Sequence, residues 1–367
     1  MKRIVIFCDG TWNSPAINQP THVHRLSQAV TNDSSQMVKY FSGVGTGGRI
    51  NTFLTNTLNK IGGGAFGWGL RAKILDAYEF VSEHYDPGDE IMIFGFSRGA
   101  YTARSLAGMI RKCGLLGRVS GSNRRKAWRL YKLAGDQNHP DLPHIHVQRK
   151  ALSPRFATSQ KDLTARGNDG SSMVKISYLG IWDTVGALGI PVPLFGPIAR
   201  AWNSKYEFHD TNLSSMIHSA RHALALDERR KMFLPTVWRN LDKTPTTPGL
   251  NNGDTSDARA FQQVWFVGDH GMVGGSGVTR GLTSITLAWL AEGATRAGMT
   301  MDPATILLDA APDPLATGPE QHEHTLFDRL APDLMGWRVG VKAAHTIHPS
   351  VQTRVDGTPG YNPPSLH

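Results

Sequence analysis

The chain has 367 residues, 39 Lys and Arg against 30 Asp and Glu, a formal net charge of +9, and 40% hydrophobic residues. A chain of this length buries a core without disulfides, and the composition fits neither a disordered chain nor a fibrous repeat. Only two cysteines are present, without a Cys-x-x-Cys pair or a Cys/His cluster, so we expect no disulfide scaffold or structural zinc site. Cys8 and Cys113 are expected to be core thiols in a reducing compartment.

No apolar run reaches the ~18 residues that a membrane span needs. The apolar stretch Ile4–Cys8 stops at Asp9, too early for a signal peptide. We therefore expect a cytoplasmic protein by sequence. The charge excess has three interpretations: nucleic-acid binding, attraction to an anionic membrane surface, or solubility alone.

Predicted strands and helices alternate along the chain. Apolar runs predict strands at Arg3–Cys8, Val38–Phe41, Glu90–Gly95, Val174–Trp182 and Ala260–Val267. Helical spacing of apolar residues predicts helices at Phe66–Tyr85, from Ser97 to about Cys113, and at Ser284–Ala297. This alternation indicates an α/β fold with a mostly parallel sheet covered by helices on both faces, whose chemistry lies beyond the C-terminal ends of strands.

The elements predict one domain over residues 1–350. Two stretches do not fit the sheet: residues 116–173, which are basic, and residues 189–211, which combine prolines with large apolar side chains. Each is expected to be an insertion, either a lid or cap over a site or a surface loop. Residues 351–367 are expected to be a loosely ordered tail.

Gly95-Phe96-Ser97-Arg98-Gly99 matches Gly-x-Ser-x-Gly between a predicted strand and a predicted helix. In this context the serine lies on a strained turn, and the glycines allow the helix to approach the strand. The turn exposes the Ser97 hydroxyl beside the helix N-terminus, where the Arg98 amide can stabilise an oxyanion. Ser97 is therefore the predicted nucleophile; the alternative is a glycine-rich turn with a solvated serine.

A serine nucleophile needs a histidine base and a carboxylate that orients it, and in this fold the acid precedes the histidine along the chain. Asp183 and His270 each follow a predicted strand and are our candidates for these roles. Asp269 and Asp227 are the alternative acids. The other histidines considered are expected to be structural or exposed, and those in the basic insertion lack partners for a metal site: His209, His218, His222, His139, His144 and His146.

The loop after the first strand is expected to supply the second oxyanion donor, from amides at Gly10 and Thr11. Asp9 in the same loop is expected to form an Asx turn or a cap, with an oxygen-ligated cation as the open alternative. Gly43–Gly48 lacks the Gly-Lys-Ser/Thr ending of a phosphate loop, so turn glycines are expected there.

Six segments together resemble the catalytic domain of the type VI secretion phospholipase effectors of the first lipase family, which also contains uncharacterised α/β-hydrolases. They begin at Phe7, Gly43, Gly95, Trp182, Ala223 and Val264, and read FCDGTWN, GVGT, GFSRGA, WDTVG, ALALDERR and VWFVGDH. The resemblance implies an α/β-hydrolase fold, a triad of Ser97, Asp183 and His270, and phospholipase A activity. Because effectors of this kind need no cleavable signal, the resemblance also leaves delivery by a specialised secretion system open. The chain departs from that family's pattern where Val267 replaces Pro and Met272 replaces Asp.

We therefore predict a serine hydrolase of carboxylic esters, of the lipase or phospholipase A type, that uses no cofactor or metal. Asp9 and Asp269 are the predicted supporting residues. An ester or phospholipid substrate and peripheral contact with an anionic membrane are expected, nucleic acid is not, and the oligomeric state is left open. The alternatives are a non-catalytic lipid- or partner-binding protein on a hydrolase fold, supported by the altered residues near His270, and a nucleic-acid binder, supported by the charge alone.

Overall fold

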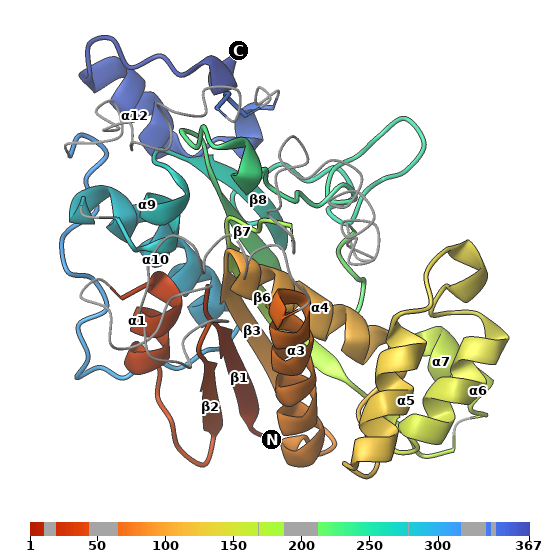
Figure 1. The fold of residues 1–367 in the computed structure, drawn as a ribbon. Helices are drawn as coiled ribbons and strands as arrows, with labels where there is room; N and C mark the ends of the chain where they lie inside the picture. The colour runs from red at the N-terminus through yellow and green to blue at the C-terminus, as the bar shows by residue number, and fades with distance from the viewer. Residues whose placement is uncertain are drawn as a thin grey trace.

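The computed structural model describes residues 1–10, 20–43, 65–167, 169–186, 212–277, 279–316, 335–338 and 343–367. The predicted insertion 189–211 and the oxyanion candidate Thr11 lie outside these ranges. Helices and strands are labelled as in Figure 1.

Six strands form one sheet in the order β2-β1-β3-β6-β7-β8, and every neighbouring pair is parallel. The strands are β1 (Arg3–Cys8), β2 (Gln36–Phe41), β3 (Glu90–Phe96), β6 (Lys175–Trp182), β7 (Ala220–Ala225) and β8 (Phe261–Phe266). The chain passes from β1 to β2 on one side and then to β3 on the other, so the strand order reverses between β1 and β3. Open α/β sheets bind ligands at the C-terminal strand ends beside such a reversal.

Side chains of β1 alternate between the two faces of the sheet, as the pleat requires. Ile4 and Ile6 belong to one apolar cluster together with residues of α3 (Ala65–His84) and α4 (Arg98–Cys113). Val5 and Phe7 belong to the other cluster, with residues of α1 (His22–Ala29) and α10 (Arg280–Arg296). Figure 1 shows these helix pairs on opposite faces of the sheet. The predicted α/β-hydrolase-like class is therefore confirmed.

Strand β7 is not among the strands predicted from the sequence, and His222 lies on it. The segment reads ARHALA, which has the composition of a helix and no β-branched residue. All six residues are buried, because β7 lies inside the sheet between β6 and β8. Burial in the sheet thus overrides the local helix propensity.

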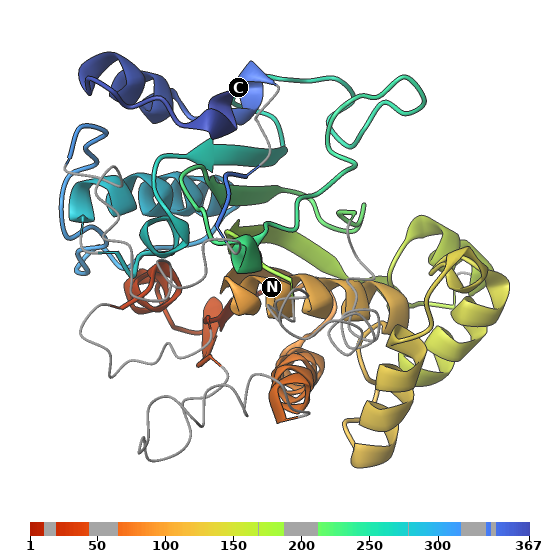
Figure 2. The ribbon, with the colours of Figure 1, turned by 45° about the horizontal axis from the view of Figure 1, so that its top comes forward.

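The basic insertion 116–173 is a small helical unit rather than a loop. It contains α5 (Gly121–Tyr131), α6 (Pro143–Leu152), α7 (Gln160–Ala165), the 3-10 helix Asp136–Asn138, and the paired short strands β4 (Phe156–Ala157) and β5 (Ser172–Met173). Its core holds a buried ion pair, with Arg149 3.0 Å from Asp162. Figures 1 and 2 show α5, α6 and α7 grouped to one side of the sheet, beyond α4.

The insertion contacts the C-terminal end of α4. Arg111 donates to Thr158 at 3.2 Å, and Arg149 donates to the carbonyl of Lys112 at 3.1 Å. Sixteen residues of α-helix span about 24 Å, so these contacts are roughly that far from Ser97 at the other end of α4. This position does not fit a lid over Ser97.

The tail 351–367 differs from the loose order expected for it. It contains most of α12 (Pro349–Gly357) and the 3-10 helix Pro364–Leu366. Val351 is 1% exposed in the same cluster as α10, and the Tyr361 hydroxyl donates to Asp227 at 3.0 Å. The expectation of loose order was wrong because a few apolar side chains suffice to anchor a short helix against the sheet layer.

Candidate active site

Ser97 lies at the turn between β3 and α4, with φ 58° and ψ −121°. This positive φ is costly for any residue with a side chain and marks a locally strained backbone. The flanking glycines are sterically required, as expected. A Cβ on Gly99 would lie 2.0 Å from the carbonyl oxygen of Cys8, and a Cβ on Gly95 would lie 2.4 Å from that of Gly99. The sequence therefore folds into a sharp strand-to-helix turn that presents Ser97.

The structure brings Ser97, His270 and Asp183 together through two hydrogen bonds. His270 Nδ1 lies 2.6 Å from Asp183 Oδ2, and His270 Nε2 lies 2.8 Å from Ser97 Oγ. Because an ionised carboxylate only accepts, Nδ1 carries the proton and Nε2 is left to accept from the serine hydroxyl. The three residues are at most 6% exposed. This arrangement allows the imidazole to take a proton from Ser97.

Aromatic rings fix the plane of the His270 imidazole. Phe233 stacks on it with centroids 4.8 Å apart, and Phe96 lies 4.7 Å away at 33°. His270 begins α9 (His270–Gly274), and Asp269 caps this helix by accepting from the Met272 amide at 2.8 Å. Asp269 thus holds the backbone beside His270, and its carboxylate is used in the cap.

Asp183 follows β6 with a positive φ of 36°. Its Oδ1 accepts from the Ala225 amide at 3.0 Å. Arg338 approaches from the other side and donates to Oδ1 at 2.6 Å and to Oδ2 at 2.8 Å. Burial alone would raise the pKa of Asp183, but the Arg338 guanidinium and the hydrogen bonds from Arg338 and His270 hold that pKa well below its usual range. The carboxylate is therefore ionised at neutral pH.

Sequence reasoning missed Arg338, which is 155 residues from Asp183. It is 4% exposed and also donates to the carbonyls of Ala225 at 2.8 Å and Phe233 at 2.6 Å. The segment before it docks through Met335, which forms an antiparallel bridge with Arg230. Nothing in the surrounding sequence marks a functional arginine, so only the folded chain could identify it.

The structure places the two described candidates for oxyanion donors, the amides of Arg98 and Gly10, differently from each other. Arg98 is the first residue of α4, where the helix dipole favours negative charge. The Gly10 amide donates to Asp9 Oδ1 at 2.7 Å, so the prediction that this N–H faces an oxyanion was wrong. The short Asp9 side chain reaches its own following amide, the Asx contact that competes for loop N–H groups.

Asp9 is 5% exposed and holds the start of α1 to the end of β1. Its carboxylate accepts from Thr21 at 2.8 and 2.9 Å and from the Tyr40 hydroxyl at 2.6 Å. Burial raises the pKa of Asp9 despite these hydrogen bonds. Within the part of the chain that the structure describes, no three His, Cys, Asp or Glu side chains form a group that could hold a metal ion.

Asp227, the other alternative acid, hydrogen-bonds to groups that hold the fold together and not to His270. It accepts from the Gly268 amide at 2.7 Å and from Tyr361, and so joins β7, β8 and the C-terminal segment. His222 accepts from the Thr184 amide at 3.2 Å, whereas His218 is exposed. Both cysteines are buried free thiols, as predicted.

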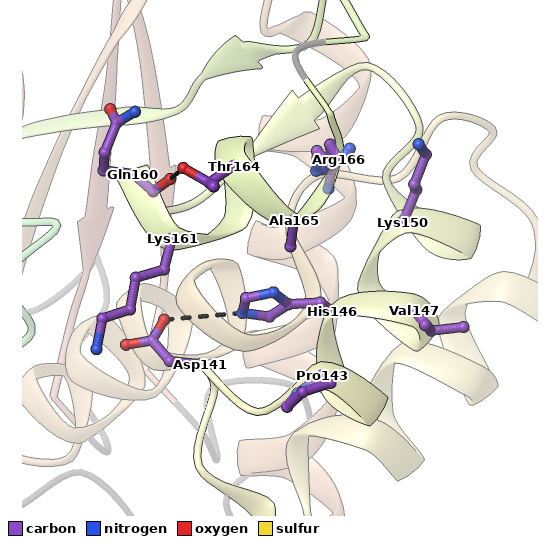
Figure 3. Close-up of a pocket in the computed structure, with 10 residues that line it drawn as sticks. All are labelled: Asp141, Pro143, His146, Val147, Lys150, Gln160, Lys161, Thr164, Ala165 and Arg166. Carbon is purple, nitrogen blue, oxygen red and sulfur yellow. Dashed lines mark hydrogen bonds and ion pairs between the residues drawn. The ribbon is translucent and has the colours of Figure 1, made fainter.

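A cavity of about 540 Å³ lies in the helical insertion, between α6 and α7. Figure 3 shows His146 pointing toward Asp141 inside it, with Nε2 and Oδ1 4.0 Å apart. Apolar atoms of Pro143, Val147 and Ala165 complete much of its lining. None of the predicted site residues lines this cavity, so it is separate from Ser97.

A family model described as T6SS, phospholipase effector Tle1-like, catalytic domain, matches residues 2–293. The chain belongs to this family. The match includes Ser97, Asp183 and His270, whereas Arg338 lies beyond it. The uncharacterised protein YEL023C of Saccharomyces cerevisiae is 30% identical over 245 residues, which cover 63% of this chain and 32% of the yeast protein. The chain thus spans about a third of the length of that relative.

Three solved structures show weaker similarity. An uncharacterised protein from Pseudomonas aeruginosa has a TM-score of 0.45 at 17% identity, covering 82% of this chain and 47% of that one. The Tle1 effector bound to the VgrG spike of the type VI secretion system has a TM-score of 0.36 at 17% identity, covering 75% and 51%. The NocB thioesterase domain has a TM-score of 0.31 at 10% identity, covering 81% and 95%.

The matched model describes the catalytic domain of phospholipase effectors. Among the described residues of this chain, no helix has the length and apolar character required to span a membrane.

Proposed function

We propose that this chain is a serine hydrolase that cleaves carboxylic ester bonds of phospholipids through an acyl-enzyme on Ser97. The observation that carries the proposal is the pair of hydrogen bonds, 2.8 and 2.6 Å long, from Ser97 through His270 to Asp183. The family supports a phospholipid as the substrate class. Acyl chain and head group are left unassigned.

In the first half-reaction, Ser97 Oγ attacks the ester carbonyl carbon while its proton passes to His270 Nε2. Asp183 stabilises the resulting imidazolium and keeps the ring oriented. The tetrahedral oxyanion accepts from the Arg98 amide at the start of α4. A second donor is expected from Thr11 in the loop after β1.

The tetrahedral intermediate then collapses. The bond from the carbonyl carbon to the alkoxy oxygen breaks, His270 Nε2 returns its proton to the leaving alcohol, and the acyl group stays on Ser97. A water molecule attacks this ester, gives its proton to His270, and releases the free acid while Ser97 regains its hydrogen. These steps need no oxidant, metal or organic cofactor.

Turnover of phospholipid vesicles and short acyl esters by the wild-type chain and by Ser97→Ala tests this proposal. We expect fatty acid release by the wild type and a loss of at least about 10⁴-fold in Ser97→Ala, because the nucleophile is removed. Matching thermal unfolding curves would show that the variant is folded. Full activity in folded Ser97→Ala would contradict the proposal, and a wild type inactive on every ester would favour the non-catalytic binding protein.

The distribution of charge supports peripheral contact with an anionic membrane. Residues 116–173 contain eleven Lys and Arg against four Asp and Glu, so seven of the nine net positive charges lie in the insertion. Arg125, Lys126 and Arg129 of α5 are exposed. A concentrated positive surface attracts anionic lipid at physiological salt.

A further inference from the structure

We infer that Arg338 is a positioning residue for the proposed reaction, which holds Asp183 in place and weakens its stabilisation of the His270 imidazolium. This inference rests on the proposed function and assigns a role to a residue outside the region that the family model matches.

The contacts of Arg338 show how it fixes the carboxylate. Two of its nitrogens contact the two oxygens of Asp183, at 2.6 and 2.8 Å, in the paired geometry that gives arginine its directionality. The same two nitrogens donate to the carbonyls of Ala225 and Phe233. The guanidinium is therefore fixed by two backbone groups on different segments, and rotation of the Asp183 carboxylate would break both ion-pair contacts.

Arg338 also competes electrostatically with His270. Asp183 Oδ2 accepts from Arg338 at 2.8 Å and from His270 Nδ1 at 2.6 Å, so a cation and the imidazole share one oxygen. When His270 gains a proton, two positive groups lie against one carboxylate. Because like charges repel, Arg338 opposes the positive charge that His270 gains when it takes the proton of Ser97.

Other titratable and charged groups face this pair from neighbouring segments. Glu228 accepts from the His270 amide at 3.2 Å and is paired with Arg230 at 2.6 Å. Burial alone would raise the pKa of Glu228, but the hydrogen bond and charge of Arg230 outweigh burial and lower that pKa, so Glu228 stays ionised. His222 is buried, which lowers its pKa to about 3, and it stays neutral. Arg104 interacts electrostatically with His222, Asp227 accepts from the Gly268 amide, and Asp269 is the N-cap residue directly before His270. All are retained in the variants below.

The test compares kcat/KM against pH for the wild type, Arg338→Gln, Arg338→Met and Arg338→Lys. In both neutral variants we expect the acid limb of the profile to move to higher pH by about one unit, since the competing charge is gone. Arg338→Lys keeps the positive charge but loses the paired contact with Asp183. We therefore expect the acid limb of its kcat/KM profile to lie at the wild-type pH, while kcat falls about tenfold. A merely structural role would lower the active fraction without moving the limb.

Arg149→Gln is the matched control. Arg149 is also fully buried and ion-paired, to Asp162 at 3.0 Å, and also donates to backbone carbonyls, but it lies in the insertion. Its loss removes a buried arginine without touching Asp183, so the acid limb should not move. The active fraction of each protein is measured by fluorophosphonate titration, and folding by thermal unfolding.

The outcomes separate this inference from the proposed function. A wild type that neither turns over esters nor reacts with fluorophosphonate would overturn the function, and the inference would fall with it. A reactive wild type together with an unmoved acid limb in a folded neutral variant would overturn only the role of Arg338. If neither neutral variant folds, Arg338→Lys decides, because an unchanged kcat in that variant contradicts positioning by the paired contact.

Discussion

Ser97 adopts a backbone conformation, φ 58° and ψ −121°, that strongly favours glycine. Ser97→Gly and Ser97→Ala both remove the hydroxyl, but only glycine relieves the strain. We expect Ser97→Gly to be more stable than Ser97→Ala by about 1 kcal/mol, as relieved strain of 1–3 kcal/mol exceeds the entropy that glycine costs. Urea unfolding measures the difference, and equal stability would show that the turn stores no strain at Ser97.

Asp183 is the buried counter-charge of Arg338, and its removal leaves an uncompensated guanidinium. We expect Asp183→Asn to lower the free energy of unfolding by about 3 kcal/mol and kcat by about 10⁴-fold. Asp254→Asn, at an exposed turn, is the control and should change neither. Denaturant unfolding measures the first effect and ester turnover the second. An Asp183→Asn protein as stable as the control would contradict the proposed stabilisation by the Asp183–Arg338 ion pair.

The depressed pKa of Asp183 also predicts how the unfolding free energy depends on pH. Asp183 has a lower pKa in the folded protein than in the unfolded chain. Its contribution to the unfolding free energy is therefore complete above the pKa of about 4 that it has in the unfolded chain. This contribution is lost as the pH falls through the pKa that Asp183 has in the folded protein. The stability difference between wild type and Asp183→Asn should therefore be constant from about pH 6 to 8 and shrink only in acid. A difference that already falls near pH 6 would contradict this.

Individual site residues differed in how far the sequence revealed them. Ser97, Asp183 and His270 each follow a buried strand, and parallel strands bring their C-terminal ends to one edge, so the sequence could predict their proximity. Arg338 lies outside any helix or strand and Phe233 ends a three-residue 3-10 helix, and segments this short carry no periodic pattern. Gly10 was misjudged because a neighbouring side chain, Asp9, takes its amide.

At the level of elements, the close approach of α4 to β1 depends on Gly99. A Cβ there would lie 2.0 Å from the Cys8 carbonyl oxygen, which is rigid backbone. We expect Gly99→Ala to lower the unfolding free energy by at least about 2 kcal/mol and to reduce ester turnover, because α4 must move away from the sheet. Gly121→Ala in α5 is the control, since its added Cβ meets only the end of Arg125 at 3.5 Å. Equal thermal stability of the two variants would contradict this account.

The elements that the sequence predicted well are those with a strong local pattern. The apolar runs of β1 and β3 and the periodic spacing of α3 gave boundaries within a residue or two of the observed ones. Strand β7 and helix α12 were missed because their stability comes from what they pack against. The helices of the insertion were missed for a related reason, since their polar and basic composition hides a small core around Arg149 and Asp162.

For the whole molecule, the net charge belongs mainly to one unit, residues 116–173. We expect binding to vesicles that contain anionic lipid, with binding falling as salt rises. Arg125→Glu with Arg129→Glu, on exposed positions of α5, should weaken binding at least about tenfold. Arg239→Glu with Lys243→Glu alters the net charge equally at exposed positions outside the insertion and is the control. Vesicle sedimentation in which both pairs behave alike would contradict a role for the insertion.

The parallel sheet and its helical layers could be predicted from the alternation of elements along the chain. The sheet order β2-β1-β3-β6-β7-β8 could not, because strand neighbours are set by long-range packing rather than by local pattern. The position of the insertion at the far end of α4 followed only from contacts of residues such as Arg111 with Thr158.

The proposed mechanism depends on acylation of Ser97. Reaction of the intact chain with a fluorophosphonate, followed by proteolysis and mass spectrometry, tests it most directly. We expect one adduct, on Ser97, which is absent from Ser97→Ala and forms much more slowly in His270→Ala. An adduct on another serine, or labelling of Ser97→Ala at the wild-type rate, would contradict it.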